Sequence, residues 1–430
     1  MRICLRNAFA LACGAVLSAA LCAGTVFAQA PQLPQSKTTL NPEKVQEIDK
    51  MVEKAIADGL TPGAVVAVVR RDGVVLMKAY GNRQVEPTVE KMTTDSIFDL
   101  ASVTKVTATA ISVHILADRG VLDIDKPVAA YLPEFGVNGK ENTTIRQCLT
   151  HTTGLVPDNS LKDYTGSLED IKANICKLPI KNVGDFVYSD LGMIAMGYII
   201  KNLTGQTLDV FAKENIYKPL GMNDTGYNPP ESKLDRIVPT ERRTPDDKDF
   251  IRGKVHDPRA FAMQGVAGHA GNFSTAPDLA VLGMMLLNHG TYIKPDGEKV
   301  QILSEKEFDL MSADQELRGI NKFWNKVNVR SLGWDKRSTF SRNRSPLMSN
   351  SAIGHGGFTG TVFWVDPDND VCFILLGSCL HPNGFHGSLY PLGGDLGTLV
   401  MEGLPQEEQE RIQRLKPEKA EKPVEEKPAE

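Results

Sequence analysis

The stretch A-V-V-A-V-V-R-R-D-G-V-V-L-M-K-A-Y-G, residues 64–81, is the clearest fold signal in the chain. It contains two valine-rich runs around Asp72-Gly73, and this arrangement is a strong β-hairpin signal. A second pair of such runs, T-V-F-W-V-D-P and V-C-F-I-L-L-G, flanks residues 368–370 near the other end of the chain. We therefore predict one hairpin toward each end of the folded body.

The residues between the two predicted hairpins follow a different pattern. From about Ser102 to Gly290 the apolar residues recur mostly at helical spacing, with loops between the runs. Strands at both ends and helices in the middle favour one antiparallel sheet that takes strands from both ends of the chain. The predicted fold class is therefore α/β of the α+β type, with an antiparallel sheet flanked by helices and a mostly helical insertion.

The composition narrows the class of protein. The chain has 430 residues, of which 41% are hydrophobic and 23% charged, and its formal net charge is -5. These values are typical of a soluble globular protein and exclude wholesale disorder, a collagen-like fibre and a polytopic membrane protein. The mild acidity gives no reason to expect nucleic acid as a partner.

The first 28 residues form a predicted signal peptide. Arg2 and Arg6 precede an uncharged apolar run over residues 8–28, which ends with the small residue Ala28. The alternative is an uncleaved anchor, because the run is long enough to span a bilayer. We therefore expect a periplasmic or secreted protein, with membrane association only if the signal stays uncleaved.

The last residues, 405–430, consist mostly of Glu, Lys, Arg, Gln and Pro. Because this segment has few large apolar residues to bury, we predict a disordered or partly helical tail. The folded domain then spans residues 29–404. Its four cysteines either form disulfides or remain as buried free thiols, and none shows zinc-ligand spacing: Cys148, Cys176, Cys372 and Cys379.

The segment F-D-L-A-S-V-T-K, residues 98–105, ends with Ser102 and Lys105 three residues apart. A helical pattern follows, so Ser102 is expected to begin a helix with Lys105 one turn later on the same face. A lysine whose pKa is lowered by burial can take the proton of a serine nucleophile. Taken alone, however, the pattern favours a structural role, because a serine cap followed by a lysine is common.

Two further segments contain groups that suit catalysis. F-V-Y-S-D-L-G, residues 186–192, contains Tyr188 and Asp190, and a buried tyrosine beside an acid can relay protons. I-G-H-G-G-F-T-G-T, residues 353–361, offers a donor at His355 and glycines that let a ligand approach the backbone. Each also has a structural alternative, which is a capped turn for the first and a glycine-rich bulge for the second.

Taken together and in this order, the three segments resemble the penicillin-recognising serine hydrolases. This family includes class C β-lactamases, DD-peptidases and esterase relatives, and its S-x-x-K signature carries the nucleophile. The resemblance covers about residues 45–403 and implies a β-lactamase-like fold. Further similar stretches are T-I-R-Q-C-L-T-H-T-T-G-L (144–155), P-L-G-M-N-D-T (219–225) and F-S-T-A-P-D-L-A (273–280).

The resemblance implies a role for each matching residue. Ser102 matches the acylated nucleophile, Lys105 its base partner and Tyr188 the proton shuttle. His355-Gly356-Gly357 falls where the family has Lys-Thr-Gly or His-x-Gly on a strand at the sheet edge. The backbone N–H groups of Ser102 and Phe358 would hold the oxyanion. The resemblance implies no cofactor.

Three positions depart from the β-lactamase pattern. Asp190 stands where the family usually has Asn, and its pairing with Lys105 would raise the lysine pKa. His355 replaces a fixed cation that helps to bind the substrate carboxylate, and Gly356 replaces a hydroxyl. These changes weaken the case for β-lactam hydrolysis and are compatible with a DD-peptidase or an esterase.

The segment V-H-D-P-R-A-F-A-M-Q-G-V-A-G-H-A-G, residues 255–271, resembles a stretch of the DD-carboxypeptidase-like branch. Its residues His256, Asp257 and His269 are candidates for lining the pocket near Ser102. The residue types are those of zinc ligands, but the spacing matches no recognised motif. We therefore expect a structured loop with hydrogen-bonded histidines and no metal.

The sequence therefore predicts a serine hydrolase that works through an acyl-enzyme on Ser102. A cell-wall peptide ending in D-Ala-D-Ala is the expected substrate, because the chain looks exported and resembles that branch. An esterase or a β-lactamase would use the same residues on another small molecule. A non-catalytic penicillin-binding or sensor module is the alternative of a different class, and Asp190 leaves it open.

Overall fold

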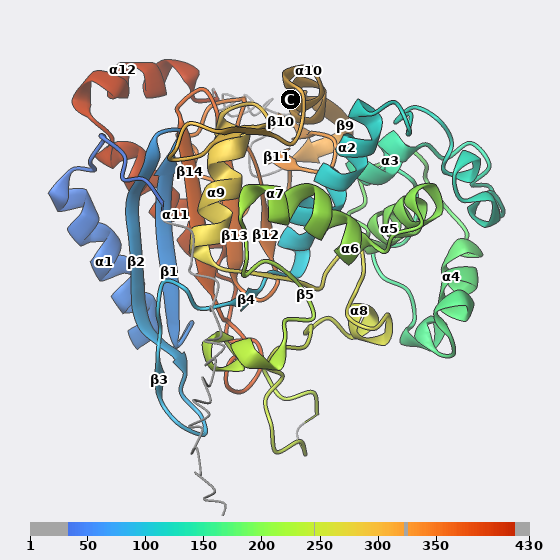
Figure 1. Ribbon diagram of the computed structural model, residues 1–430, viewed down its shortest axis with the longest axis horizontal. Coiled ribbons are helices and arrows are strands. Elements are labelled where there is room, and N and C mark those ends of the chain that lie inside the picture. Colours follow the sequence, from blue (N-terminus) through green and yellow to red (C-terminus); the bar gives the residue numbers. More distant parts are fainter. Residues whose placement is uncertain (1–32, 245, 322–325, 418–430) are drawn as a thin grey trace, which may run out of the picture.

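The computed structural model describes residues 33–244, 246–321 and 326–417 (Figure 1). The predicted signal peptide lies outside these residues. Within the described ranges, none of the helices combines the length and the apolar character needed to cross a membrane.

A nine-stranded antiparallel sheet forms the centre of the fold (Figure 1). Both predicted hairpins are confirmed, because β1 pairs with β2 and β13 pairs with β14. β1 also pairs with β14, with Val66 opposite Leu375, so strands from the two ends of the chain do meet in one sheet. From edge to edge the strands are β3 (Glu90–Lys91), β2 (Gly73–Gln84), β1 (Gly63–Arg70), β14 (Val371–Gly377), β13 (Thr361–Asp366), β12 (Ile353–Gly357), β11 (Asp335–Arg337), β10 (Lys326–Arg330) and β9 (Gln315–Asn321).

The valine run of β1 is buried along its whole length, because helices cover both faces of the sheet. Val65 and its alternate neighbours face a core that contains α9 (Ala276–Leu287). Val66 and its alternate neighbours face a second core, which contains α1 (Pro42–Ala57) and α11 (Tyr390–Gly403). The period of two along one strand thus supplies both cores.

The predicted helical insertion lies beside the sheet (Figure 1). Two small sheets that the sequence pattern did not predict accompany it, β4-β6-β5 and β7-β8. The helices of the middle region are α2 (Ile111–Asp118), α3 (Ile145–Thr150), α4 (Leu168–Cys176), α5 (Asp190–Thr204), α6 (Leu208–Ala212), α7 (Lys218–Leu220), α8 (Pro258–Ala262) and α10 (Glu305–Ser312). The short strands are β4 (Phe98–Asp99), β5 (Gly226–Tyr227), β6 (Asn272–Ser274), β7 (Thr291–Ile293) and β8 (Lys299–Gln301).

The first part of the charged tail is helical rather than disordered. Helix α12 (Gln406–Leu415) buries Ile412 completely in the core that also holds α1 and α11. Its Glu408 forms an ion pair with Arg70 of β1 at 2.8 Å. Gln409 and Arg411 of the same helix donate to the carbonyls of Leu404 and Asn369. Residues 418–430 lie outside the described part.

The four cysteines of the described chain are free thiols and all are buried. Burial raises the pKa of the Cys148 thiol to about 12, so it stays protonated and unreactive at neutral pH. The structure therefore supports the buried-thiol alternative for these residues.

Candidate active site

Ser102 lies in a short 3₁₀ turn, Ala101–Val103, that follows β4. A π-helical turn, Lys105–Ala110, comes next and leads into α2, so the expected helix start is present but irregular. The Lys105 ammonium donates a hydrogen bond to Ser102 Oγ at 2.9 Å, as their spacing predicts. The two side chains are therefore in direct contact.

A strained residue precedes the serine. Ala101 has a φ of 44°, which is a left-handed conformation that costs about 1 kcal/mol or more for a residue other than glycine. The Asp99 carboxylate accepts a hydrogen bond from the Ala101 N–H at 2.9 Å and stabilises this turn. The sequence pattern did not predict this strain. The strained residue lies where strand β4 ends and the turn that carries Ser102 begins.

Lys105 is fully buried, and hydrogen-bond acceptors surround its ammonium group. Its Nζ lies 2.7 Å from Asp190 Oδ1 and donates to the His269 carbonyl at 3.1 Å. Burial lowers the Lys105 pKa, but the Asp190 carboxylate and Tyr188 raise it by more, so the net pKa is raised. Lys105 is therefore an ammonium ion at neutral pH in the resting enzyme, as the pairing expected for Asp190 implies.

Tyr188 immediately precedes α5, whose first turn is capped by the Ser189 hydroxyl. Its ring packs against His151 and Phe340 at centroid distances of 4.5 Å and 4.7 Å. The Lys105 Nζ lies 5.0 Å from the centre of the ring. The phenol oxygen is buried and has no hydrogen-bond partner among the described residues. It is therefore available to a substrate.

His355 lies on β12, and the structure corrects the expectation of a hydrogen-bond donor there. Its Nδ1 lies 2.8 Å from the Gly356 carbonyl, which only accepts, so Nδ1 carries the proton. Burial lowers the His355 pKa well below 6.5, and Arg330 and Lys105 lower it further. The ring is thus neutral, and its buried Nε2 is an acceptor without a partner in the described chain.

The glycines beside His355 are required by packing against the protein rather than by a ligand. A Cβ at Gly356 would overlap Asn343 and the ring of Tyr390. A Cβ at Gly357 would overlap the Leu100 carbonyl, which immediately precedes the Ser102 turn. The small residues therefore let β12 lie directly against the segment that carries Ser102.

The three segments meet in one cavity of about 280 Å³. The predicted site residues that line it are Ser102, Tyr188, His355, Gly356, Gly357 and Phe358. The remaining lining residues were not among the predicted site residues, and they come from β11, from the start of α11, from the motif 353–361 and from loops: Asp335, Phe340, Gly360, Phe385, Ser388, Leu389 and Tyr390. Ser102 and Phe358, whose N–H groups were expected to hold an oxyanion, thus share this cavity.

Exposed aromatic rings mark the mouth of this cavity. The rings of Phe358 and Phe385 are stacked with centroids 5.5 Å apart, and the two residues are 55% and 54% exposed. The ring of His256 stacks on the other side of Phe358 at 5.9 Å. The stacked rings form an exposed aromatic cluster at the cavity that Ser102 lines.

The segment 255–271 contacts the site from behind. The structure does not place His256, Asp257 or His269 among the residues that line the Ser102 cavity, contrary to expectation. His256 Nε2 lies 2.6 Å from the carboxylate of Glu241, and Asp257 caps α8. The segment contacts the site through the His269 carbonyl, which accepts a hydrogen bond from Lys105, and through the His256 ring, which stacks on Phe358.

Asp190, Asp257 and His269 offer possible metal-ligand atoms that lie within 4.8 Å of one another. These groups already have partners within the protein. Asp190 pairs with Lys105 at 2.7 Å, and His269 Nε2 lies 3.0 Å from Asp257 Oδ1. The three groups therefore form part of an internal charge network around Lys105.

A nucleophile, a lysine, a tyrosine and a glycine-bounded strand around one cavity define the site of a serine hydrolase. The chain belongs to the β-lactamase family, because the family model described as "Beta-lactamase" matches residues 48–397. It is thus a serine hydrolase of the β-lactamase and DD-peptidase superfamily, as the sequence motifs predicted.

Two curated relatives cover most of the chain. An N-acetylmuramyl-L-alanine amidase of Bacillus subtilis (strain 168) is 32% identical over 422 residues, which cover 87% of this chain and 92% of the relative. A protein of Escherichia coli (strain K12), provisionally named D-alanyl-D-alanine carboxypeptidase, is 29% identical over 416 residues, with coverage of 85% and 92%.

Solved structures confirm the predicted fold. A penicillin-binding protein homologue from Caulobacter crescentus has a TM-score of 0.66 at 22% identity, covering 85% of this chain and 99% of that one. The structure of EstA from Arthrobacter nitroguajacolicus Rue61a has a TM-score of 0.62 at 22% identity, with coverage of 85% and 98%. At these identities the likeness concerns the fold alone.

Proposed function

We propose that this enzyme hydrolyses an amide bond of peptidoglycan, and that the bond joins the lactyl group of N-acetylmuramic acid to L-alanine. The observation that carries the proposal is the neutral, buried His355 on β12. A D-Ala-D-Ala substrate places a free carboxylate next to the scissile bond, where a fixed cation would bind it. The lactyl–L-alanine bond has no carboxylate at that position, because the alanine continues into the peptide.

Arg330 does not replace the missing cation. Its guanidinium is fully buried, lies 3.5 Å from Asp335 and is not among the residues that line the Ser102 cavity. The substrate-facing strand therefore offers a neutral acceptor, His355 Nε2, which suits the N–H of an internal amide better than a carboxylate.

The aromatic surface at the mouth of the cavity supports a sugar-bearing substrate. Stacked Phe358 and Phe385 present an exposed apolar face beside Ser102. The C–H face of a hexosamine ring is flat and apolar, so it can lie on such rings while its hydroxyl groups remain in water. A plain stem peptide would leave this surface unused.

The mechanism follows from the contacts of Ser102. In the fraction of molecules with neutral Lys105, the lysine takes the Ser102 proton as Oγ attacks the amide carbonyl. Tyr188 then donates its proton to the leaving amine and takes the proton held by Lys105, and the C–N bond breaks to give an acyl-enzyme. Two backbone N–H groups, of Ser102 and Phe358, hold the oxyanion, and each is worth about 3 kcal/mol. Water finally releases the acyl group.

Hydrolysis of D-Ala-D-Ala peptides is the second candidate, and it was the expectation from the sequence. The relative from Escherichia coli and the segment 255–271 favour it. Either substrate lies outside the cytoplasm, which agrees with the signal peptide proposed for residues 1–28. The proposed partner is thus a peptidoglycan fragment, and no nucleic acid is involved.

The test compares two defined substrates. The protein is incubated with N-acetylmuramyl-L-alanyl-D-isoglutamine and, separately, with diacetyl-L-lysyl-D-alanyl-D-alanine, and products are measured by mass spectrometry. We expect release of L-alanyl-D-isoglutamine from the first, and none from the Ser102→Ala variant. Release of D-alanine without cleavage of the first substrate would replace the proposal with the carboxypeptidase reaction. No cleavage of either would contradict both.

A further inference from the structure

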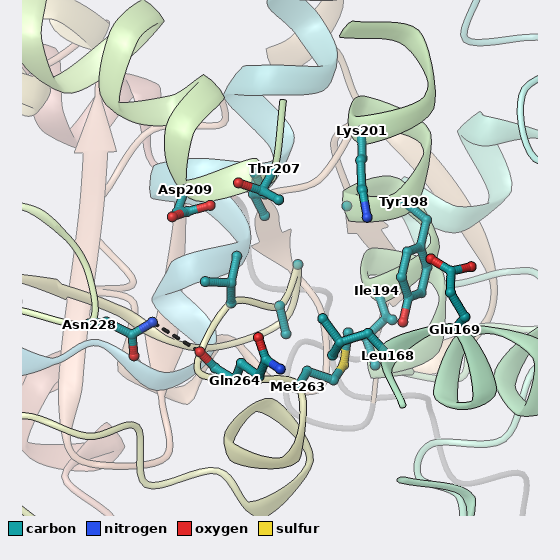
Figure 2. Close-up of a pocket in the computed structure, with 15 residues that line it drawn as sticks. Leu168, Glu169, Ile194, Tyr198, Lys201, Thr207, Asp209, Asn228, Met263 and Gln264 are labelled. Atoms are coloured by element: carbon teal, nitrogen blue, oxygen red, sulfur yellow. Dashed lines mark hydrogen bonds between the residues drawn. The ribbon is translucent and has the colours of Figure 1, made fainter. Parts of the chain in front are cut away.

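A second cavity of about 290 Å³ is lined in part by residues 266–268, which precede His269 in the chain (Figure 2). It shares no lining residue with the cavity around Ser102. Its walls come from α5, from the start of α6 and from the segment 263–268. The volume is at the lower end of the range for small-molecule sites, which begins near 300 Å³.

Two buried polar atoms of this cavity have no hydrogen-bond partner in the described part of the chain. They are the phenol oxygen of Tyr198 and Oδ1 of Asp209. Burial raises the pKa of Tyr198 well above its ordinary value, so the phenol keeps its proton and remains a donor. Because buried polar groups in proteins are nearly always paired, these two atoms are open to hydrogen bonds from whatever occupies the cavity.

The cavity also holds unpaired charges of both signs. No ion pair joins Asp209 or Lys201 to another residue within the described ranges, whereas Glu169 at the rim pairs with Lys172 at 2.6 Å. Figure 2 shows Asp209 on one side of the cavity and Lys201 and Tyr198 on the other. A ligand between them would meet a carboxylate at one end and an ammonium with a phenol at the other.

The remaining lining is mostly apolar. It includes Leu168 and Ile194, which lie beside Tyr198, and Met263 below them (Figure 2), together with Val266 and Leu208. Burial of an aliphatic group against them is favourable by about 25 cal/mol per Å². The ligand that matches this lining has an amine, a carboxylate and a small apolar body between them.

We propose that this cavity is a second ligand site that binds a free amino acid or a short zwitterionic peptide. The ligand ammonium pairs with Asp209, and its carboxylate accepts hydrogen bonds from Lys201 and Tyr198. The apolar side chain lies against Ile194 and Met263. The proposal does not depend on which amide bond the Ser102 site cleaves, because the two cavities have separate linings.

The test is calorimetric titration of the Ser102→Ala protein, which cannot turn substrate over, with L-alanyl-L-alanine. N-acetyl-L-alanyl-L-alanine amide, which lacks both charges, is the comparison ligand. We expect the zwitterion to bind and the blocked dipeptide to bind at least tenfold more weakly. Equal affinities would overturn the proposal, and so would absence of binding.

Variants then assign the site. In the same Ser102→Ala background, Asp209→Asn and Lys201→Gln should each weaken zwitterion binding about tenfold or more, and Tyr198→Phe a few-fold. Lys213→Gln, at an exposed lysine outside both cavities, is the matched control and should bind normally. The same substitutions in the Ser102 enzyme should leave hydrolysis of 4-nitrophenyl acetate unchanged, which verifies folding. Unchanged binding in both charge variants would place the dipeptide elsewhere and overturn the assignment.

Discussion

The cavity around Ser102 and the cavity around Tyr198 share no lining residue, and their charged groups are paired in different ways. Around Lys105 every charge has an internal partner, because Asp190 lies 2.7 Å from the lysine and Asp257 lies 3.0 Å from His269. Around Tyr198, Asp209 and Lys201 have no such partner among the described residues. The first site is therefore preorganised for chemistry by the protein itself, whereas the second is completed by what it binds.

The largest expected effect separates the two cavities completely. Ser102→Ala removes the nucleophile and should lower hydrolysis of 4-nitrophenyl acetate by about 10³-fold or more. Dipeptide binding should persist in the second cavity, which Tyr198 lines (the Tyr198 cavity), since that cavity does not include Ser102. Steady-state kinetics and calorimetry measure the two properties. Substantial ester turnover by the variant would exclude Ser102 as the nucleophile.

Gly268, which lines the second cavity, has no room for a side chain. A Cβ at Gly268 would overlap the backbone carbonyl of Met193 in α5. We expect Gly268→Ala to cost about 1–3 kcal/mol of unfolding free energy and to displace His269, which contacts Lys105. Both ester hydrolysis and dipeptide binding should therefore fall.

The matched control for this substitution is Gly197→Ala, measured by thermal and denaturant unfolding. The nearest atom to a Cβ at Gly197 is 3.7 Å away, and the residue lies within α5, where alanine is preferred over glycine. This variant should be at least as stable as the parent. Equal stability of the two variants would show that the backbone around Gly268 accommodates the added methyl group and does not link the two cavities.

The internal pairing of Lys105 predicts a pH effect of intermediate size. Burial lowers the Lys105 pKa, while Asp190 and Tyr188 raise it by more. Asp190→Asn removes the negative charge, so the lysine pKa falls and neutral lysine appears at lower pH. The acidic limb of the kcat/KM profile should then move down by about one pH unit or more. A limb that stays in place would indicate that Lys105 is not the base.

The smallest expected effect concerns the aromatic surface at the mouth of the Ser102 cavity. Phe385→Ala should raise KM for N-acetylmuramyl-L-alanyl-D-isoglutamine a few-fold, because one stacked ring is worth about 0.5–1.5 kcal/mol. Hydrolysis of 4-nitrophenyl acetate, which carries no sugar, should change little. Phe261→Ala removes a similarly exposed ring, 47% exposed, that lies outside both cavities. An equal effect of the two substitutions would contradict a sugar-binding role.

The sheet could be predicted from the sequence because its signals are local. Alternating valines around Asp72-Gly73 specify a hairpin without help from distant residues, and its partner hairpin has the same pattern. The contact between Ser102 and Lys105 is likewise local, since one helical turn separates them. A partly helical tail was one of the predicted alternatives, but the docking of helix α12 could not be predicted, because it involves Arg70, more than 300 positions away.

Other parts of the site depend on contacts that no sequence pattern contains. His355 is an acceptor because the Gly356 carbonyl fixes its tautomer, which residue types alone do not reveal. Phe385 reaches the catalytic cavity from a loop without a motif. The second cavity, lined by Tyr198, joins five separate stretches of the chain. Its unpaired polar atoms can be recognised only from the contacts of the described residues.

The pairing of β1 with β14 sets an order of events during synthesis. Val66 lies opposite Leu375, so β1 lacks its second neighbour until nearly the whole chain has left the ribosome. At 5–20 residues per second, the delay is about 15–60 s. A nascent chain already carries Ser102 and Lys105 but has no β12 to form the cavity with them. The hydrolase is therefore inactive during its own synthesis. Premature termination of translation yields a chain with an unpaired sheet edge instead of an active enzyme.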